Sequence, residues 1–191
     1  MSETTLAVRD WNGATIPQAG TYTLDTAHSR VGFVVKHLMV SKVRGNFGDF
    51  EGTITISEDP LQSSVSATIQ TSSVHTGQET RDNHLRSADF FETEKYPVMT
   101  FRTTGVAAGG GDSFTVSGEL TIRDVTRPVE LALDLEGVAV SPYGQQVFGF
   151  TATTEINRED FGLTYNQALE TGGVMVGKQI KIEIEGEAVR S

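Results

Sequence analysis

The sequence predicts an all-β fold in which about eight antiparallel strands curl into a barrel, with one or two short helical insertions. Three observations predict it. Apolar and polar residues alternate with period two along one segment after another. These segments follow one another at hairpin spacing with few helices between them, which is typical of antiparallel sheets. The 20 glycines exceed the average share of ~7%, and a sheet that closes on itself needs glycines and bulges.

Length, charge and composition limit the classes of function. A chain of 191 residues predicts one domain, and we expect an N-terminal arm over residues 1–18 and the barrel over 19–191. The absence of cysteine excludes disulfides and thiolate sites. A net charge of −10 argues against nucleic acid and against an anionic membrane surface as partners.

Hydropathy and the first residues bear on location. No window reaches the ~18 apolar residues of a transmembrane helix, so we expect no stable membrane insertion. The first ten residues lack the basic start and apolar region of a secretory signal. We therefore expect a cytoplasmic protein.

The first strands carry the clearest pattern. Over residues 30–37, Val31, Phe33, Val35 and His37 share one face. The segment 42–56 changes parity in its middle, which predicts a bulge at Gly48.

The rest of the chain alternates strands with two predicted helices. The pattern Thr76-Gly77-Gln78-Glu79 resembles a capping box, which predicts a helix from Thr76 to about Leu85. Residues 165–170, followed by Gly172 and Gly173, predict a second short helix. Further strands are expected where apolar residues alternate, near 65–70, 98–101, 114–122, 129–135, 147–156 and 180–185.

No catalytic motif stands out. The four histidines form no HxH or HExxH pair, and the chain has no nucleophile elbow, P-loop or GxGxxG turn. We therefore expect no enzyme, no catalytic residue, no cofactor and no metal ligand. Two charged clusters, at 81–84 and 158–162, are interpreted either as local ion pairs or as a polar rim that holds the head group of a ligand.

Five motifs, in order, resemble the YceI-like family. They are His28-Ser29-x-Val31-x-Phe33-x-Val35-x-His37, the Val43 to Gly52 pattern, Arg81-Asp82-x-His84 through Tyr96-Pro97, Gly118 to Val129, and Arg158-x-Asp160-Phe161-Gly162. The match covers about residue 20 to the C-terminus. The resemblance implies a lipocalin-like, eight-stranded barrel whose pore holds a polyisoprenoid or similar long-chain lipid.

We therefore expect non-catalytic binding of a long isoprenoid-like amphiphile, for transport, storage or sequestration. A homodimer is a further hypothesis. Two alternatives stay open: an enzyme or metal site around His28, His37 and His84, and a ligand-free stress or interaction module with a solid core. The predicted ligand-binding residues are Phe33, Val35, His37, Phe47, Phe50, Ile54, Ile69, Arg81, His84, Met99, Phe101, Phe148, Phe150, Arg158, Asp160 and Phe161.

Overall fold

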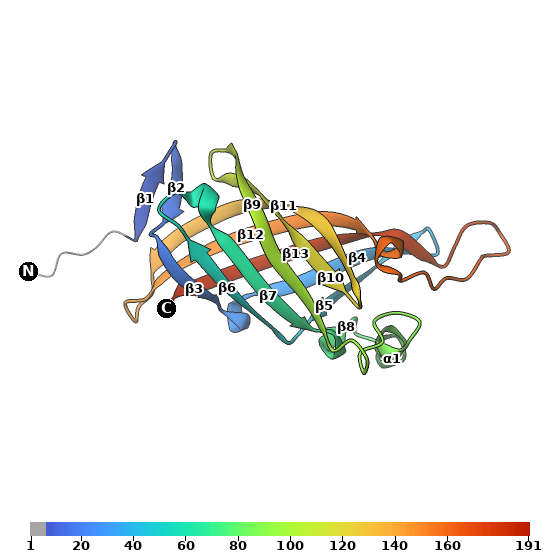
Figure 1. The fold of residues 1–191 in the computed structure, drawn as a ribbon. Helices are drawn as coiled ribbons and strands as arrows, with labels where there is room; N and C mark the ends of the chain where they lie inside the picture. Colours follow the sequence, from blue (N-terminus) through green and yellow to red (C-terminus); the bar gives the residue numbers. More distant parts are fainter. Residues whose placement is uncertain (1–6) are drawn as a thin grey trace, which may run out of the picture.

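A computed structural model describes residues 7–191, and strands make up most of this range (Figure 1). The predicted all-β class is confirmed, and α1 (Glu79–Arg86) is the one α-helix of the described residues. Single 3₁₀ turns lie at Thr26–His28, Pro60–Gln62, Thr71–Ser73 and Arg158–Phe161. The strands are β1 (Val8–Trp11), β2 (Ala14–Pro17), β3 (Gly20–Leu24), β4 (Arg30–His37), β5 (Ser41–Phe47), β6 (Phe50–Ile56), β7 (Ser64–Gln70), β8 (Val74–His75), β9 (Val98–Gly110), β10 (Ser113–Ile122), β11 (Val125–Val140), β12 (Gln146–Asn157) and β13 (Val176–Arg190).

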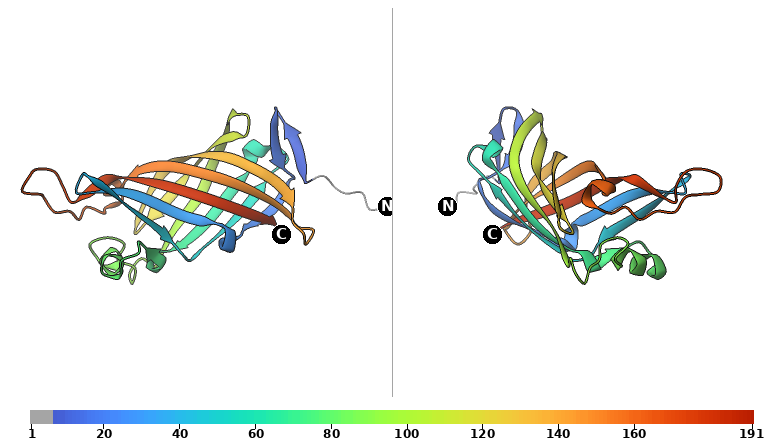
Figure 2. Two further views of the ribbon diagram at one scale, coloured as in Figure 1. Left: turned by 180° about the vertical axis from the view of Figure 1, so that it is seen from behind. Right: turned by 45° about the vertical axis from the view of Figure 1, so that its right-hand side comes forward.

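Eight antiparallel strands close into the predicted barrel. Their order is β12-β11-β10-β9-β7-β6-β3-β13, and pairing between β12 and β13 closes the ring. The closing pair is long, running in register from Val147↔Val189 to Asn157↔Gln179. Figure 2 shows the strands crossing the barrel at a strong tilt, as closure of eight strands requires.

Two further strands extend the wall at one end. The second edge of β13 pairs with β3 over three residues and then with β4, so that β3 and β4 act as two halves of one bent strand. β5 pairs with β4, and the short β8 pairs with β5. The bend lies in the segment around the 3₁₀ turn Thr26–His28.

A matching break separates β5 from β6 at the predicted place. β5 ends at Phe47 and β6 begins at Phe50, and both phenylalanines are buried. The amide of Gly48 leaves the ladder and donates to the carbonyl of Ser73. The parity change therefore lets one long segment keep its apolar side chains inward across the bend.

Residues 7–18, the described part of the expected arm, form a hairpin of β1 and β2 at one end of the barrel (Figure 1). Ala14 and Ile16 are each only 1% exposed, because they pack against Phe114 of β10. Trp11 adds a ring contact with Phe114 at 6.1 Å between centroids. This part of the chain therefore belongs to the folded body, while the rest of the expected arm lies outside the described residues.

The predicted capping box at Thr76 is wrong. α1 begins at Glu79, and Gln78 precedes it without a side-chain cap. The Thr76 amide and hydroxyl both donate to the carboxylate of Asp82, which is 4% exposed. The carboxylate of Asp82 therefore takes the Thr76 amide that the capping box assigns to Glu79, and the Thr76 hydroxyl donates to Asp82 as well.

The predicted helix over 165–170 is also wrong. These residues form an irregular loop closed by a bridge between Ala168 and Val174. The Asn166 side chain donates to the carbonyl of Val176 at 2.7 Å and accepts from the Val176 amide at 3.0 Å. This side chain pairs with the backbone in place of a helical turn, which is the competition that disfavours Asn in helices.

Candidate ligand-binding cavity

The barrel encloses an apolar cavity of about 300 Å³. All eight barrel strands contribute to its wall, from Ile16 at the hairpin to Val176 near the opposite end. The few lining residues with polar side chains are Glu51, Ser63, Ser64, Thr154 and Arg158. Since one enclosed water needs roughly 10–15 Å³, the cavity has room for on the order of twenty water-sized groups.

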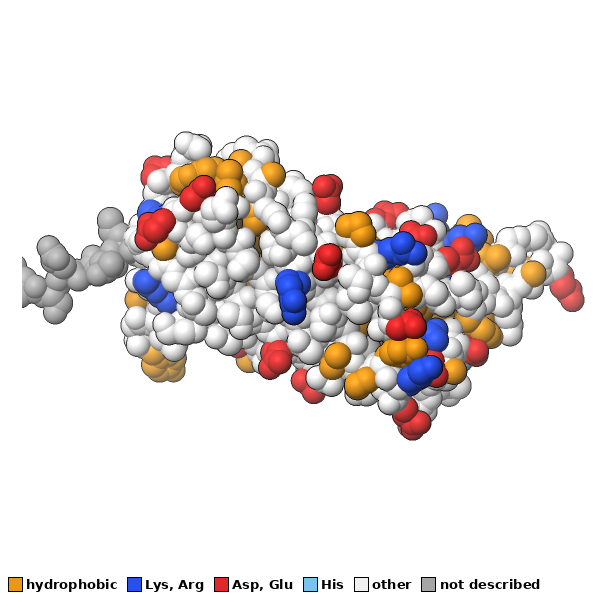
Figure 3. Space-filling model, viewed as in Figure 1, with side chains coloured by type: hydrophobic (Ala, Val, Ile, Leu, Met, Phe, Trp, Pro, Cys, Tyr) orange, Lys and Arg blue, Asp and Glu red, His pale blue; other side chains and the backbone are white. Residues whose placement is uncertain are grey.

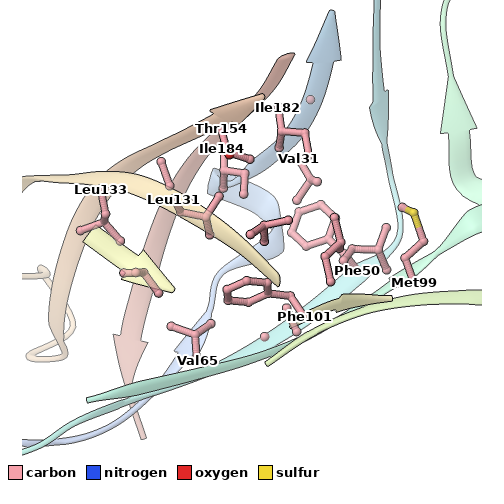
Figure 4. A pocket seen from close by; sticks show the side chains of 18 of the residues that line it. Val31, Phe50, Val65, Met99, Phe101, Leu131, Leu133, Thr154, Ile182 and Ile184 are labelled. Atoms are coloured by element: carbon pink, nitrogen blue, oxygen red, sulfur yellow. The ribbon is translucent and has the colours of Figure 1, made fainter. Parts of the chain in front are cut away.

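The interior is not filled by its own side chains. Ile182 and Ile184 of β13 and Leu133 of β11 point into the same space (Figure 4), yet they are only half-buried. Inward side chains in a close-packed core would be almost fully buried. These residues therefore do not form a solid core, which the ligand-free alternative requires.

Three phenylalanine rings lie flat on glycines of the neighbouring strand. Phe33 covers Gly45, and Phe150 covers Gly186, each directly across a strand pair. A Cβ at Gly45 or Gly186 would lie 2.4 Å or 2.3 Å from the covering ring.

The third pair is diagonal, with Phe101 covering Gly118. In all three pairs the missing Cβ lets the ring lie along the wall instead of across the lumen. The cavity therefore keeps large aromatic side chains without being blocked by them.

Arg158 is a buried cation in this largely apolar wall, 4% exposed. Its Nε donates to the Gly177 carbonyl at 2.9 Å, and its Nη1 donates to the Leu163 carbonyl at 2.7 Å. Its Nη2 makes a longer contact of 3.4 Å to the Val176 carbonyl. Burial lowers the pKa of the guanidinium, and the neighbouring Glu159 opposes this shift.

These bonds tie the 3₁₀ turn that carries Arg158 to the first residues of β13 and to Leu163, which follows the turn. Glu159 forms its ion pair with Lys178 at 3.2 Å. No carboxylate is paired with Arg158 among residues 7–191. Its charge is therefore held by backbone carbonyls at the wall of the cavity.

Of the sixteen predicted ligand-binding residues, twelve line the cavity: Phe33, Val35, Phe47, Phe50, Ile54, Ile69, Met99, Phe101, Phe148, Phe150, Arg158 and Phe161. That they touch a ligand stays a prediction. His37, Arg81, His84 and Asp160 lie outside the lining. Of the polar residues predicted to form a rim, Arg158 is therefore the one that lines the cavity.

Two of these outlying residues serve the local fold. Arg81 donates to the Thr76 hydroxyl at 2.7 Å and to the Thr76 carbonyl at 2.9 Å. The His84 Nε2 lies 2.8 Å from a carboxylate oxygen of Asp89, and its ring meets those of Phe90 and Tyr165 edge-on. The Arg81 bonds hold α1 to Thr76 before it, and the His84 contacts join α1 to the segment after it.

Sequence reasoning missed much of the wall on the later strands. Leu131, Leu133, Ile182 and Ile184 all line the cavity. Their alternation with polar residues predicts an inward face for β11 and β13. The same pattern also fits a solid core, so it gave no reason to assign these residues to a ligand.

The histidines proposed for a metal site are not brought together. Within residues 7–191, one group of three possible metal-binding side chains is close enough to share an ion, and it consists of Asp25, His28 and Glu187. His37 and His84 do not belong to it. His28 is already paired with Asp25, at 2.9 Å between Nδ1 and the carboxylate.

The helices of residues 7–191 include none that is long and apolar enough to cross a bilayer. The fold and the cavity together define a class of protein, the lipocalin-like antiparallel barrel with an apolar lumen along its axis. Loops and turns surround both ends of this lumen (Figure 1).

Within that class the chain belongs to the YceI-like family, whose domain model matches residues 22–188. A UPF0312 protein of Staphylococcus aureus strain N315 is 43% identical over 168 residues, which cover 87% of this chain and 95% of the relative. The family predicted from the five sequence motifs is thereby confirmed.

Solved structures agree with this assignment. A Campylobacter jejuni YCEI protein is 36% identical, with a TM-score of 0.70 over 89% of this chain and 98% of the other. BcnA of Burkholderia cenocepacia shares the fold at 22% identity, with a TM-score of 0.76 over 86% and 98% of the two chains. A domain from Saccharophagus degradans, described as polyisoprenoid-binding, has a TM-score of 0.65 at 17% identity over 91% and 100%.

Proposed function

We propose that this protein binds one long isoprenoid-like amphiphile in its lumen, without catalysing a reaction, and so transports, stores or sequesters it. The observation that carries the proposal is the unfilled apolar cavity, whose inward isoleucines and leucines stay accessible. The description of the Saccharophagus domain as polyisoprenoid-binding supports the choice of ligand class.

The chemistry of the wall favours a hydrocarbon tail. Each buried methylene adds ~0.8 kcal/mol, which is about a fourfold gain in affinity. The wall has few polar side chains, so the length of the tail sets most of the affinity. Arg158, a lone buried cation in that wall, is the residue best placed to orient a polar or anionic end of the ligand.

The test is uptake of a series of prenyl alcohols of increasing length by delipidated protein. We expect affinity to rise with each isoprene unit until the lumen is full, and then to level off. Ile184→Trp should abolish binding of the longer alcohols because its indole fills the middle of the lumen (Figure 4).

Glu185→Trp is the matched control, since the same residue is placed one position along β13 on the exposed face. It should bind like the wild type. Affinity that does not depend on tail length, or equal loss in the two tryptophan variants, would contradict binding in the lumen.

A further inference from the structure

The turn between β4 and β5 exposes three consecutive apolar side chains at one end of the molecule (Figure 1). Leu38, Met39 and Val40 are 38%, 53% and 84% exposed. We call these three residues the apolar tip. Leucine, methionine and valine side chains favour burial, so three in a row on a projecting turn suggest a surface that is covered by something else.

The backbone of the tip argues against a purely structural reason for these residues. Val40 donates to the carbonyl of His37 at 3.2 Å, which closes a turn with Leu38 and Met39 at its centre. Both central residues have positive φ, 52° and 62°. Asn-Gly is the pair that such a turn favours. The sequence instead keeps two large apolar residues in a conformation that strains them.

Two lysines flank the tip on the outer face of the strands. Lys36 of β4 lies directly opposite Lys42 of β5. Neither makes an ion pair with any residue of the described range 7–191, whereas the nearby Lys178 is paired with Glu159. Like charges directly across a strand pair are destabilising, so this pair too suggests a partner of opposite charge.

The tip adjoins one end of the cavity. The Leu38 amide donates to the Met175 carbonyl at 2.8 Å, next to the lining residue Val176. Val35, three residues before the tip on β4, also lines the cavity. On the face seen in Figure 3, the Lys and Arg side chains toward the right-hand end, where Figure 1 places this turn, lie among Asp and Glu side chains.

We propose that the apolar tip is a membrane-contact element: it inserts into the interface of a bilayer that carries anionic lipid head groups, with Lys36 and Lys42 against those head groups. Apolar side chains beside cations are the combination that binds such a surface. The net charge of −10 disfavours this partner for the molecule as a whole, but the local arrangement at the tip favours it. The purpose of the contact, exchange of lipid with the cavity, rests on the proposed function.

The test is flotation of the full chain with phosphatidylcholine vesicles, with and without phosphatidylglycerol. The wild type should float with the anionic vesicles and lose binding as salt rises. Lys36→Gln/Lys42→Gln should weaken binding by about fivefold for each lysine. The triple variant Leu38→Asn/Met39→Gly/Val40→Ser should weaken it at least about tenfold, because it removes most of the apolar area.

The triple variant also installs the Asn-Gly pair that the turn favours, so it should unfold at the same temperature as the wild type or higher. Val140→Ser/Tyr143→Ser is the matched control. It removes two exposed apolar side chains, 50% and 89% exposed, at the turn after β11. That turn lies at the opposite end of the barrel (Figure 1), so this variant should float like the wild type.

The proposal is overturned if the wild type does not bind anionic vesicles, if the tip variant binds as well as the wild type, or if the control loses as much as the tip variant. Uptake of a prenyl alcohol delivered from detergent, measured in parallel, should be unchanged in every variant. If the wild type takes up no prenyl alcohol from detergent, the proposed function is refuted. The vesicle experiment would still decide whether the apolar tip contacts membranes.

Discussion

Phe150 and Gly186 show how single residues shape the lumen. The ring of Phe150 occupies the space where a β-carbon of residue 186 would stand. The same relation holds for Phe33 and Gly45 on the β4–β5 pair. In each pair the glycine has no side chain, and the phenylalanine ring occupies that space beside the wall. The width of the cavity therefore depends on these glycines, although they contribute no side-chain contact of their own.

Gly186→Ala tests this relation. The new methyl group must push the Phe150 ring toward the lumen, because the ring is the nearest group at 2.3 Å. We expect a loss of about 1–3 kcal/mol in the free energy of unfolding, together with weaker binding of long prenyl alcohols than of short ones. Denaturant titration and the alcohol series measure the two effects.

Gly149→Ala is the control for that substitution. A Cβ there would be 3.8 Å from its nearest neighbours, an ordinary contact. It should change neither stability nor the preference for tail length by a comparable amount. If Gly186→Ala behaved the same way, the ring would not limit the width of the lumen.

His28 and Asp25 predict a dependence of stability on pH. The hydrogen bond to Asp25 raises the pKa of His28, and the same bond lowers the pKa of Asp25. The folded state therefore favours protonated His28, and this contribution is complete below the unfolded value of ~6.5. It is lost as pH rises through the folded pKa of His28.

Asp25 acts in the opposite direction, since its contribution is lost as pH falls below ~4. Thermal unfolding from pH 5 to 9 should show a decline in midpoint for the wild type that is smaller in His28→Gln. The effect should be small because the imidazole is largely exposed. Identical pH profiles for the two proteins would contradict the assignment.

At the scale of elements, the β1–β2 hairpin packs at one end of the barrel (Figure 1). An isolated hairpin is marginal in water, so its stability depends on Ala14 and Ile16 packing on Phe114. Arg9 adds bonds to the carbonyls of Pro17 and Glu58. This element lies at the end of the barrel opposite the apolar tip (Figure 1).

Ile16→Ala should lower the free energy of unfolding by about 2–5 kcal/mol, because Ile16 is 1% exposed and lines the cavity. Thr15→Ala, an exposed neighbour on the same strand, should change it by less than about 0.5 kcal/mol. Chemical denaturation of both variants measures the difference. Equal stability of the two would mean that packing of the hairpin against Phe114 does not stabilise the barrel.

The elements also show what sequence reasoning reaches. Period-two alternation predicted the strands and the inward side of residues such as Phe33 and Phe101, since burial of one face imposes that period. It could not foresee that Thr76 would bond to Asp82, because these residues are six positions apart, whereas a capping box pairs residues three positions apart. Nor could it foresee the partners of Arg158, which are backbone carbonyls such as that of Gly177, nineteen positions away.

At the scale of the whole molecule, the alternation of apolar and polar residues identifies the side chains that face the interior of the barrel. It does not show whether these side chains fill that interior. Inward residues alternate with outward residues in the same way whether the interior is a solid core or an open lumen. The alternation at Ile182 and Ile184 is therefore compatible with either interior. The family resemblance supplied the expectation of a pore, and the barrel has a cavity. The apolar tip adds a direction to the molecule, with the β1–β2 hairpin at one end and a tip suited to a bilayer at the other.

Native mass spectrometry of the full chain tests the central claim most directly, because it reports the mass and stoichiometry of any bound molecule. Protein purified without detergent, or delipidated and then exposed to a long prenyl alcohol, should appear as a one-to-one complex. The complex should be lost in Ile184→Trp and kept in Glu185→Trp. A spectrum of bare protein under both conditions would contradict the account.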